Sequence, residues 1–253
     1  MKRWKLTLEY DGGAFCGWQR QAHAPSVQQA IEEAVAGFSA ESVTLHVAGR
    51  TDAGVHAREQ VAHMDLEKEM EGSRLCSAVN FYLRPHKIAL LNAQEVAPDF
   101  HARFDARGRV YRYRIVNRRP PLVLDKDQAW HVTRLLDVVA MQRAADLLIG
   151  HHDFSTFRAA DCQANSPHRT LDRLFFTQEG EVLTLQAEAR SFLYHQVRNM
   201  VGTLALVGAN EWTLDNFAAA FAACDRTRGG PTAPPQGLCL WDVRYGIPHH
   251  PIS

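Results

Sequence analysis

The sequence lacks an excess of charge of either sign, because 28 Lys and Arg residues balance 28 Asp and Glu residues. This balance counts against nucleic-acid binding driven by net charge, although a local basic patch would still support it. The sequence also lacks an apolar run long enough to span a membrane, and its N-terminus has no apolar core of signal-peptide length. We therefore expect a soluble, cytoplasmic protein with no membrane partner.

Cysteine is scarce and shows no pairing pattern. The five cysteines are widely spaced and none forms a CxxC pair. This excludes a disulfide framework and the familiar cysteine zinc sites, and it favours free thiols in a reducing cytosol. His151, His152 and Asp153 with His168 could suggest a metal site, but their spacing matches no familiar ligand pattern. We expect no metal.

The hydrophobic and charged fractions, 46% and 22%, are those of a globular protein. Apolar residues alternate over 4–10, which predicts a half-buried strand, and Ser26 with Gln29 forms a capping box ahead of a helix at 27–38. The other elements expected in the first hundred residues are strands near 43–47, 61–64 and 88–91, with a short helix before the last of them.

A second series of elements begins near residue 105. Residues 109–116 predict a strand whose two tyrosines and isoleucine share one face, while Arg112 and Arg114 share the other. Helices are expected at 135–148, at 193–204 and after Thr213, a hairpin at 171–176 and 183–189, and a closing strand at 238–245. The sequence therefore predicts an α+β fold with a mainly antiparallel sheet, in two domains, residues 1–104 and residues 105–253.

The most informative segment is 48–57. Two glycines, Gly49 and Gly54, bracket Arg50 and Asp52 directly after a predicted strand. Glycine permits unusual backbone angles and the close approach of a ligand, so the turn would present the Asp52 carboxylate at the end of a rigid element. The alternative is a structural turn in which the aspartate bonds only its own backbone.

Residues 49–57, GRTDAGVHA, resemble the motif of the TruA family of tRNA pseudouridine synthases, and every residue of that motif is present. Four further blocks resemble family segments in the same order: YDG with FCGWQ in 10–19, FHAR with YRY in 100–113, FLYHQVRNMVG in 192–202 and APPQGL in 233–238. The resemblance covers nearly the whole chain. It implies the pseudouridine synthase fold, which has two ferredoxin-like or RRM-like units around a mainly antiparallel sheet. The first would carry the catalytic aspartate and the second would complete the active-site cleft.

The resemblance implies an isomerase that acts as a homodimer on uridines 38, 39 and 40 in the anticodon arm of tRNA. It makes Asp52 the catalytic residue and Arg50 a contact to the RNA and its flipped-out nucleotide. It places Tyr111 against the target uracil and pairs Arg198 with Asp52, whose pKa that guanidinium would lower. Without the resemblance, Tyr111 is a core tyrosine and Arg198 a surface arginine on a helix. His56 could contact substrate or support the turn.

The implied chemistry suits a carboxylate. The N1–C1′ bond breaks, the uracil turns, and a C5–C1′ bond forms. Asp52 could act as a nucleophile at the sugar, or as a base and stabiliser of a cationic sugar. No redox step occurs and no group leaves the molecule, so neither a metal nor an organic cofactor is required.

Arginines are concentrated in one short segment, with six in the thirteen residues 107–119. Such a run is an ordinary solvated face or, beside a tyrosine strand, a surface for RNA phosphates. The RNA-binding candidates are Arg107, Arg109 and Arg112. Two other functions remain open: a non-catalytic RNA-binding protein, and a metal-dependent hydrolase built on the histidines.

Overall fold

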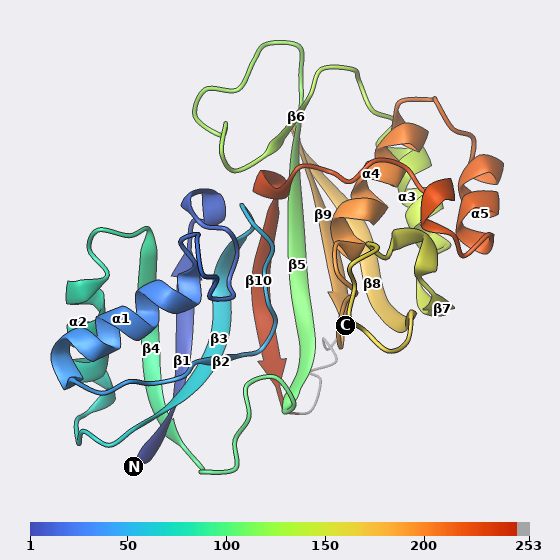
Figure 1. Cartoon of the computed structure of the whole chain (residues 1–253). Helices are drawn as coiled ribbons and strands as arrows, with labels where there is room; N and C mark the ends of the chain where they lie inside the picture. The colour runs from blue at the N-terminus through green and yellow to red at the C-terminus, as the bar shows by residue number, and fades with distance from the viewer. Residues whose placement is uncertain (247–253) are drawn as a thin grey trace, which may run out of the picture. The chain divides into compact units, whose positions relative to one another are not determined.

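The computed structural model describes residues 1–246, and the chain divides into two compact units (Figure 1). Unit 1 is Met1–Arg107 together with the segment from Cys239, and unit 2 is Gly108–Leu238. The division at Arg107 lies close to the predicted boundary at residue 105. The final strand is grouped with unit 1. The reason is its pairing, described next.

Unit 1 contains a sheet of four strands in line, a short fifth strand paired to one of them, and two helices. Its elements are β1 Lys2–Tyr10, the 3-10 turn Gly12–Ala14, α1 Val27–Ser39, β2 His46–Val47, β3 His56–Leu66, α2 Gly72–Tyr82, β4 Ile88–Val96 and β10 Leu238–Tyr245. The strand order is β4-β1-β3-β10, with the short β2 paired to β3. These pairs are antiparallel except β10 with β3, where Cys239 lies opposite His56.

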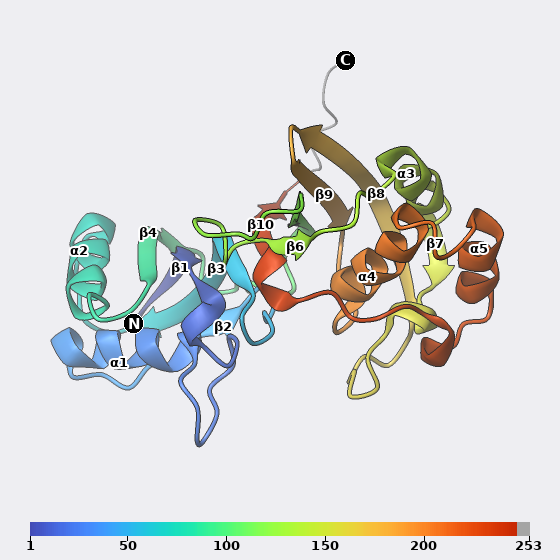
Figure 2. The same ribbon diagram turned by 90° about the horizontal axis from the view of Figure 1, so that it is seen from above.

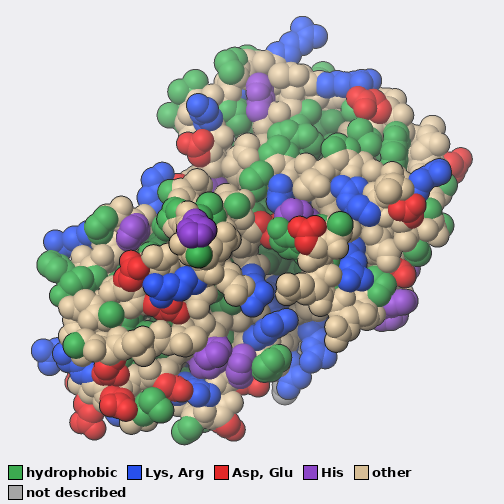
Figure 3. Space-filling view, viewed as in Figure 1, with side chains coloured by type: hydrophobic (Ala, Val, Ile, Leu, Met, Phe, Trp, Pro, Cys, Tyr) green, Lys and Arg blue, Asp and Glu red, His purple; other side chains and the backbone are tan. Residues whose placement is uncertain are grey.

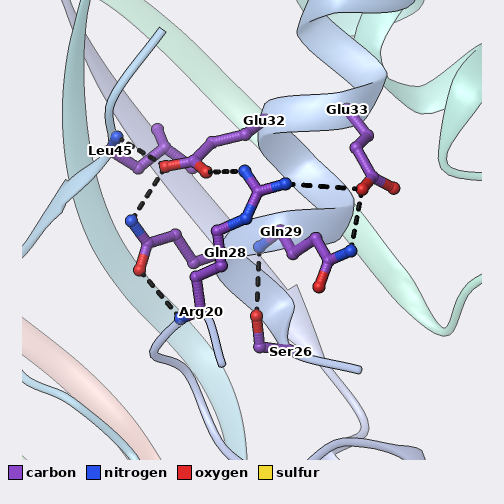
Figure 4. A network of polar contacts seen from close by, with 7 residues as sticks. All are labelled: Arg20, Ser26, Gln28, Gln29, Glu32, Glu33 and Leu45. Carbon is purple, nitrogen blue, oxygen red and sulfur yellow. Dashed lines mark hydrogen bonds and ion pairs between the residues drawn. The ribbon is translucent and has the colours of Figure 1, made fainter. Parts of the chain in front are cut away.

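The core of unit 1 follows from the alternation in β1. Trp4, Leu6 and Leu8 are buried, and α1 and α2 cover one face of the sheet (Figure 2). Helix α1 begins at its predicted cap, where the Ser26 hydroxyl accepts a hydrogen bond from the Gln29 backbone N–H at 3.2 Å. The side-chain amide of Gln29 donates to a glutamate of α1 instead of returning to Ser26 (Figure 4). The predicted capping box is therefore only half formed.

Unit 2 is a second mixed sheet with three helices. Its elements are β5 Ala106–Asn117, which starts at the unit boundary, β6 Trp130–Val132, α3 Val138–Asp146, β7 Gly150–Asp153, β8 His168–Glu179, β9 Val182–Ala189, α4 Gln196–Gly208 and α5 Leu214–Ala222, with 3-10 turns at Ser155–Phe157, Arg226–Arg228 and Pro235–Gly237. The strand order is β5-β9-β8-β7, all antiparallel, and β6 adds to β5 in parallel. Each unit thus carries a mostly antiparallel sheet, as predicted.

The two faces of β5 differ as the sequence predicts. Tyr113 and Ile115 are fully buried and Tyr111 is 9% exposed, whereas Arg112 and Arg114 are partly exposed on the opposite face. The helices pack on one face of this sheet, where Gln142 of α3 is hydrogen bonded to the main chain of β8. In the described part of the chain, no helix has the length and apolar character needed to cross a membrane.

Candidate active site

Asp52 lies in the turn that joins β2 to β3. The Asp52 side chain is half-buried, and Arg50, two residues earlier, is exposed. The main-chain carbonyl of Asp52 accepts from Val55 N at 3.1 Å, which closes the turn. Gly54 has φ +77°, a left-handed conformation that residues with a side chain rarely adopt. The second glycine of the motif is therefore required by the backbone.

The turn is held by a second segment, residues 12–18, through main-chain contacts. Trp18 N donates to Thr51 O at 3.0 Å, and Gly54 N donates to Phe15 O at 3.3 Å. The two backbones touch, because a Cβ on Gly17 would lie 2.7 Å from Thr51 O and one on Gly12 would overlap the Val55 carbonyl. The glycine-rich block after β1 therefore fixes the position of the turn that carries Asp52.

His56 supports this arrangement from the first residue of β3. Its side chain is buried, and its Nδ1 accepts from Gly12 N at 3.1 Å. The same nitrogen lies 3.2 Å from the Asp11 carboxylate, which also accepts from Lys87 at 2.8 Å. Burial acts to raise the pKa of Asp11, but the Lys87 ammonium and the Gly13 N–H outweigh it and leave that pKa below its usual value. Of the two interpretations of His56, the structure shows the supporting contact.

A buried carboxylate that sequence reasoning missed ties helix α1 to the segment before the turn and to the segment that follows the glycine-rich block (Figure 4). Glu32 accepts from Leu45 N at 3.1 Å, just before β2, and from the Arg20 guanidinium at 2.9 Å, just after the glycine-rich block. Gln28 donates to Glu32 and accepts from Arg20 N. The available signal was a glutamate beside the apolar face of an amphipathic helix, since an unpaired charge is costly there.

Unit 2 holds Tyr111 and Arg198, and Tyr111 is described first. Its ring meets Phe192 edge to face, with centroids 5.2 Å apart and planes at 90°. Aromatic pairs favour this geometry, and it holds the Tyr111 ring in one orientation. The strand around it is rigid, because Tyr111 lies opposite Ala187 in the middle of the β5–β9 ladder.

Arg198 lies on α4 and is held by the loop before β10. Its Nε donates to Ala233 O at 2.8 Å, and Ala233 N donates back to Arg198 O at 3.1 Å. The hydroxyl of Tyr113 donates to Pro234 O at 2.7 Å, which anchors the same loop. A Cβ on Gly202 would overlap the Pro231 carbonyl, so the loop packs directly on the helix backbone. Arg198 is thus a half-buried, fixed guanidinium.

The arginine-rich segment does not present one surface. Arg107 is exposed, and the buried Arg109 donates to the Arg190 carbonyl. Arg112 lies on the opposite face of β5 from Tyr111 and donates to Gln186 Oε1 at 2.9 Å. Their contacts with RNA stay a prediction.

Charge is mixed over the surface drawn in Figure 3, where Lys and Arg side chains are scattered among Asp and Glu. Among residues 1–246 no group of three or more His, Cys, Asp and Glu side chains is placed to hold a metal ion. The histidines His151 and His168 of the suggested cluster stack with ring centroids 5.8 Å apart. Within unit 1, a half-buried carboxylate on a stiff turn is suited to attack or to proton abstraction at a bound ligand.

Comparison with known proteins defines the class. The family model of tRNA pseudouridine synthases matches residues 7–105 and 144–246, which include the Asp52 turn, the glycine-rich block and α4. The chain belongs to the tRNA pseudouridine synthase family. It is an isomerase that converts uridine to pseudouridine in tRNA.

Individual relatives are similar along their whole length. The chain is 55% identical to the tRNA pseudouridine synthase A of Rhodospirillum centenum over 245 residues, covering 97% of this chain and 100% of the relative. It is 53% identical to that of Rhodospirillum rubrum, covering 97% and 88%, and 49% identical to that of Maricaulis maris, covering 98% and 100%. The resemblance noted in the sequence is confirmed.

Proposed function

We propose that Asp52 is the catalytic carboxylate of this isomerisation and that the substrates are uridines 38, 39 and 40 in the anticodon arm of tRNA. The observation that carries the proposal is the Asp52 turn itself. It is half-buried, closed by Gly54 in a left-handed conformation, and fixed by the main chain of residues 12–18. Such rigidity is what a group needs that must meet a sugar carbon in one orientation.

The reaction assigns a task to each proposed residue. The N1–C1′ bond breaks with Asp52 as nucleophile or as stabiliser of the cationic sugar. The free uracil turns, C5 bonds to C1′, C5 loses its proton, and N1 ends protonated. The Tyr111 face would stack on the uracil and allow it to turn, because stacking holds a ring without fixing its edges. Arg198 would keep Asp52 ionised, and Arg50 would hold the extruded nucleotide.

The wider context is proposed on the same basis. Extruding a stacked uridine costs a few kcal/mol, which contacts from Arg50, Tyr111 and the RNA-binding candidates Arg107, Arg109 and Arg112 would offset. We expect a homodimer that acts in the cytoplasm. We also expect it to need no metal or organic cofactor, because the reaction is an internal rearrangement. The strand order β4-β1-β3-β2 of unit 1 supports a ferredoxin-like arrangement there.

The test is release of tritium from C5 of tritiated uridine in tRNA. We expect release by the wild type, a loss of about a thousandfold or more in Asp52→Asn because the reacting group is removed, and wild-type rates in Asp99→Asn, which changes an exposed aspartate of the same unit. Transcripts with one uridine at position 38, 39 or 40 test the positions. Tight tRNA binding without release by the wild type would favour the non-catalytic alternative.

A further inference from the structure

Three buried polar side chains form a hydrogen-bonded chain that ends in the Asp52 turn. Gln60 of β3 has no exposed surface, Tyr10 at the end of β1 is 4% exposed, and Thr51 is 6% exposed. Gln60 Nε2 lies 3.2 Å from the Tyr10 hydroxyl, which lies 2.8 Å from Thr51 Oγ1. Thr51 is the residue before Asp52, so the chain ends at the base of the proposed catalytic carboxylate.

One direction in this chain is set by chemistry, because the amide nitrogen of Gln60 can only donate and the Tyr10 oxygen therefore accepts from it. Burial raises the pKa of Tyr10, which keeps the phenol protonated. Between the Tyr10 and Thr51 hydroxyls either oxygen can be the donor. The three side chains therefore form one continuous hydrogen-bonded chain from β3 to the turn.

Gln60 also holds the other end of the same short segment. Its Nε2 donates to Gly49 O at 2.8 Å, and its Oε1 accepts from Val61 N at 3.2 Å. One amide thus bonds the chain two residues ahead of Thr51 and, through Tyr10, bonds Thr51 itself. Between these two anchors lies Arg50. Packing alone would not require a buried glutamine here, since burying a polar group is costly unless its bonds are made.

We propose that Gln60 and Tyr10 are positioning residues that set the orientation of the Asp52 carboxylate through Thr51. This inference rests on the proposed catalytic role of Asp52. Neither residue touches the substrate. Their effect is on the rate of the chemical step, because a small displacement of a reacting group lowers the rate without changing how the rest of the RNA binds.

The test compares two substitutions at Thr51. Thr51→Val removes the hydroxyl and keeps the shape, and we expect kcat for tritium release to fall about 10- to 100-fold with an unchanged KM for tRNA. Thr51→Ser keeps the hydroxyl, and we expect kcat to stay within about threefold of the wild type. Tyr10→Phe should match Thr51→Val, because the ring keeps its place beside Trp18, at 6.0 Å between centroids. Tyr82→Phe removes an exposed hydroxyl of the same unit and serves as the control.

The results distinguish a failure of the positioning role of Gln60 and Tyr10 from a failure of the proposed catalytic role of Asp52. Melting temperatures measured for every variant restrict the kinetics to temperatures at which each is folded. If Asp52→Asn is inactive while Thr51→Val and Tyr10→Phe keep the wild-type kcat, the positioning role is wrong and the catalytic role stands. Equal losses in Thr51→Ser and Thr51→Val would also overturn it. If Asp52→Asn is as active as the wild type, the proposed role of Asp52 fails first.

Discussion

The Asp52 turn in unit 1 and the Arg198 helix in unit 2 are held in different ways. The turn is fixed by main chain against main chain, with glycines at the points of closest approach. The Arg198 helix also meets its loop main chain against main chain, at Gly202 and through the bond from Ala233 N, but the guanidinium itself is fixed by a side-chain bond from Nε to Ala233 O. Main-chain contacts leave little room for adjustment, whereas side chains can change rotamer. We therefore expect substitutions at the turn to affect activity more sharply than those around α4.

The largest effect is expected from Gly12→Ala. Its Cβ would overlap the Val55 carbonyl, and neither backbone can move without disturbing the Asp52 turn. We expect the free energy of unfolding to fall by more than about 3 kcal/mol, as for other strained core substitutions, with loss of pseudouridine formation. Gly13→Ala is the matched control, because its Cβ would face only the Asp11 side chain at 3.1 Å. Similar losses in both variants, in denaturant titrations and tritium release, would contradict the main-chain account.

Asn199→Ala tests the side-chain network of unit 2. Asn199 is 1% exposed, donates to Phe157 O and accepts from Arg226 and Thr232. Removing the Asn199 side chain takes away these hydrogen bonds, so we expect the free energy of unfolding to fall by about 2–4 kcal/mol. The folded variant should keep kcat within about tenfold, since the surrounding side chains can rearrange. Asn165→Ala, at an exposed loop position, should change neither the free energy of unfolding nor kcat. A kcat loss as large as that of Gly12→Ala would remove the contrast between the units.

A pH effect on stability is expected from unit 1. The pKa of His63 is lowered to about 4, first by burial and then by its neighbours His46, His101 and Arg3, against which Asp65 acts weakly. An unfolded histidine titrates near 6.5. Between these values the unfolded chain binds a proton that the folded chain does not, so stability falls as the pH drops from about 6.5 to 4, by up to about 3 kcal/mol.

The check is a series of denaturant unfolding curves across that pH range. His63→Asn removes the titrating ring, and its stability should change less with pH. His151→Asn, at an exposed position of unit 2, should keep the wild-type slope. An unchanged slope in His63→Asn would show that another group is responsible.

The smallest effects are expected from single arginines. Arg107→Gln removes an exposed charge, and we expect about a twofold to fivefold weaker affinity for tRNA and a salt dependence reduced by the share of one phosphate contact. Arg112→Gln should have less effect, because Arg112 already bonds Gln186 on the other face of β5 from Tyr111. Binding titrations at several salt concentrations measure both. A larger effect of Arg112→Gln would place the RNA on that face.

Local patterns predicted much of this structure. The helix cap at Ser26, the hairpin around Gly180 and the two faces of β5 follow from periodicity and turn residues, and they are confirmed. The position of the Asp52 turn also follows from its glycines. These features depend on residues that are close together in the sequence.

Features that depend on distant residues were not predicted. Gly12 meets Val55, and Glu32 bonds both Leu45 and Arg20, only because the sheet and helix of unit 1 bring these segments together. No local pattern specifies such partners. The pairing of the last strand with β3 was not predicted for the same reason, since the two strands lie far apart in the sequence.

That last strand has a consequence for synthesis. Cys239 and Leu240 lie opposite His56 and Ala57, immediately after the turn that carries Asp52. A chain growing on the ribosome makes the Asp52 turn first, and it lacks the neighbouring strand until Leu238–Tyr245 has been added. A domain folds as a unit once all its parts are available. Unit 1 is therefore completed only after all of unit 2 has been made. A chain that has not reached Leu238–Tyr245 would carry the proposed catalytic group on an incomplete sheet, so we expect activity only after β10 has been made.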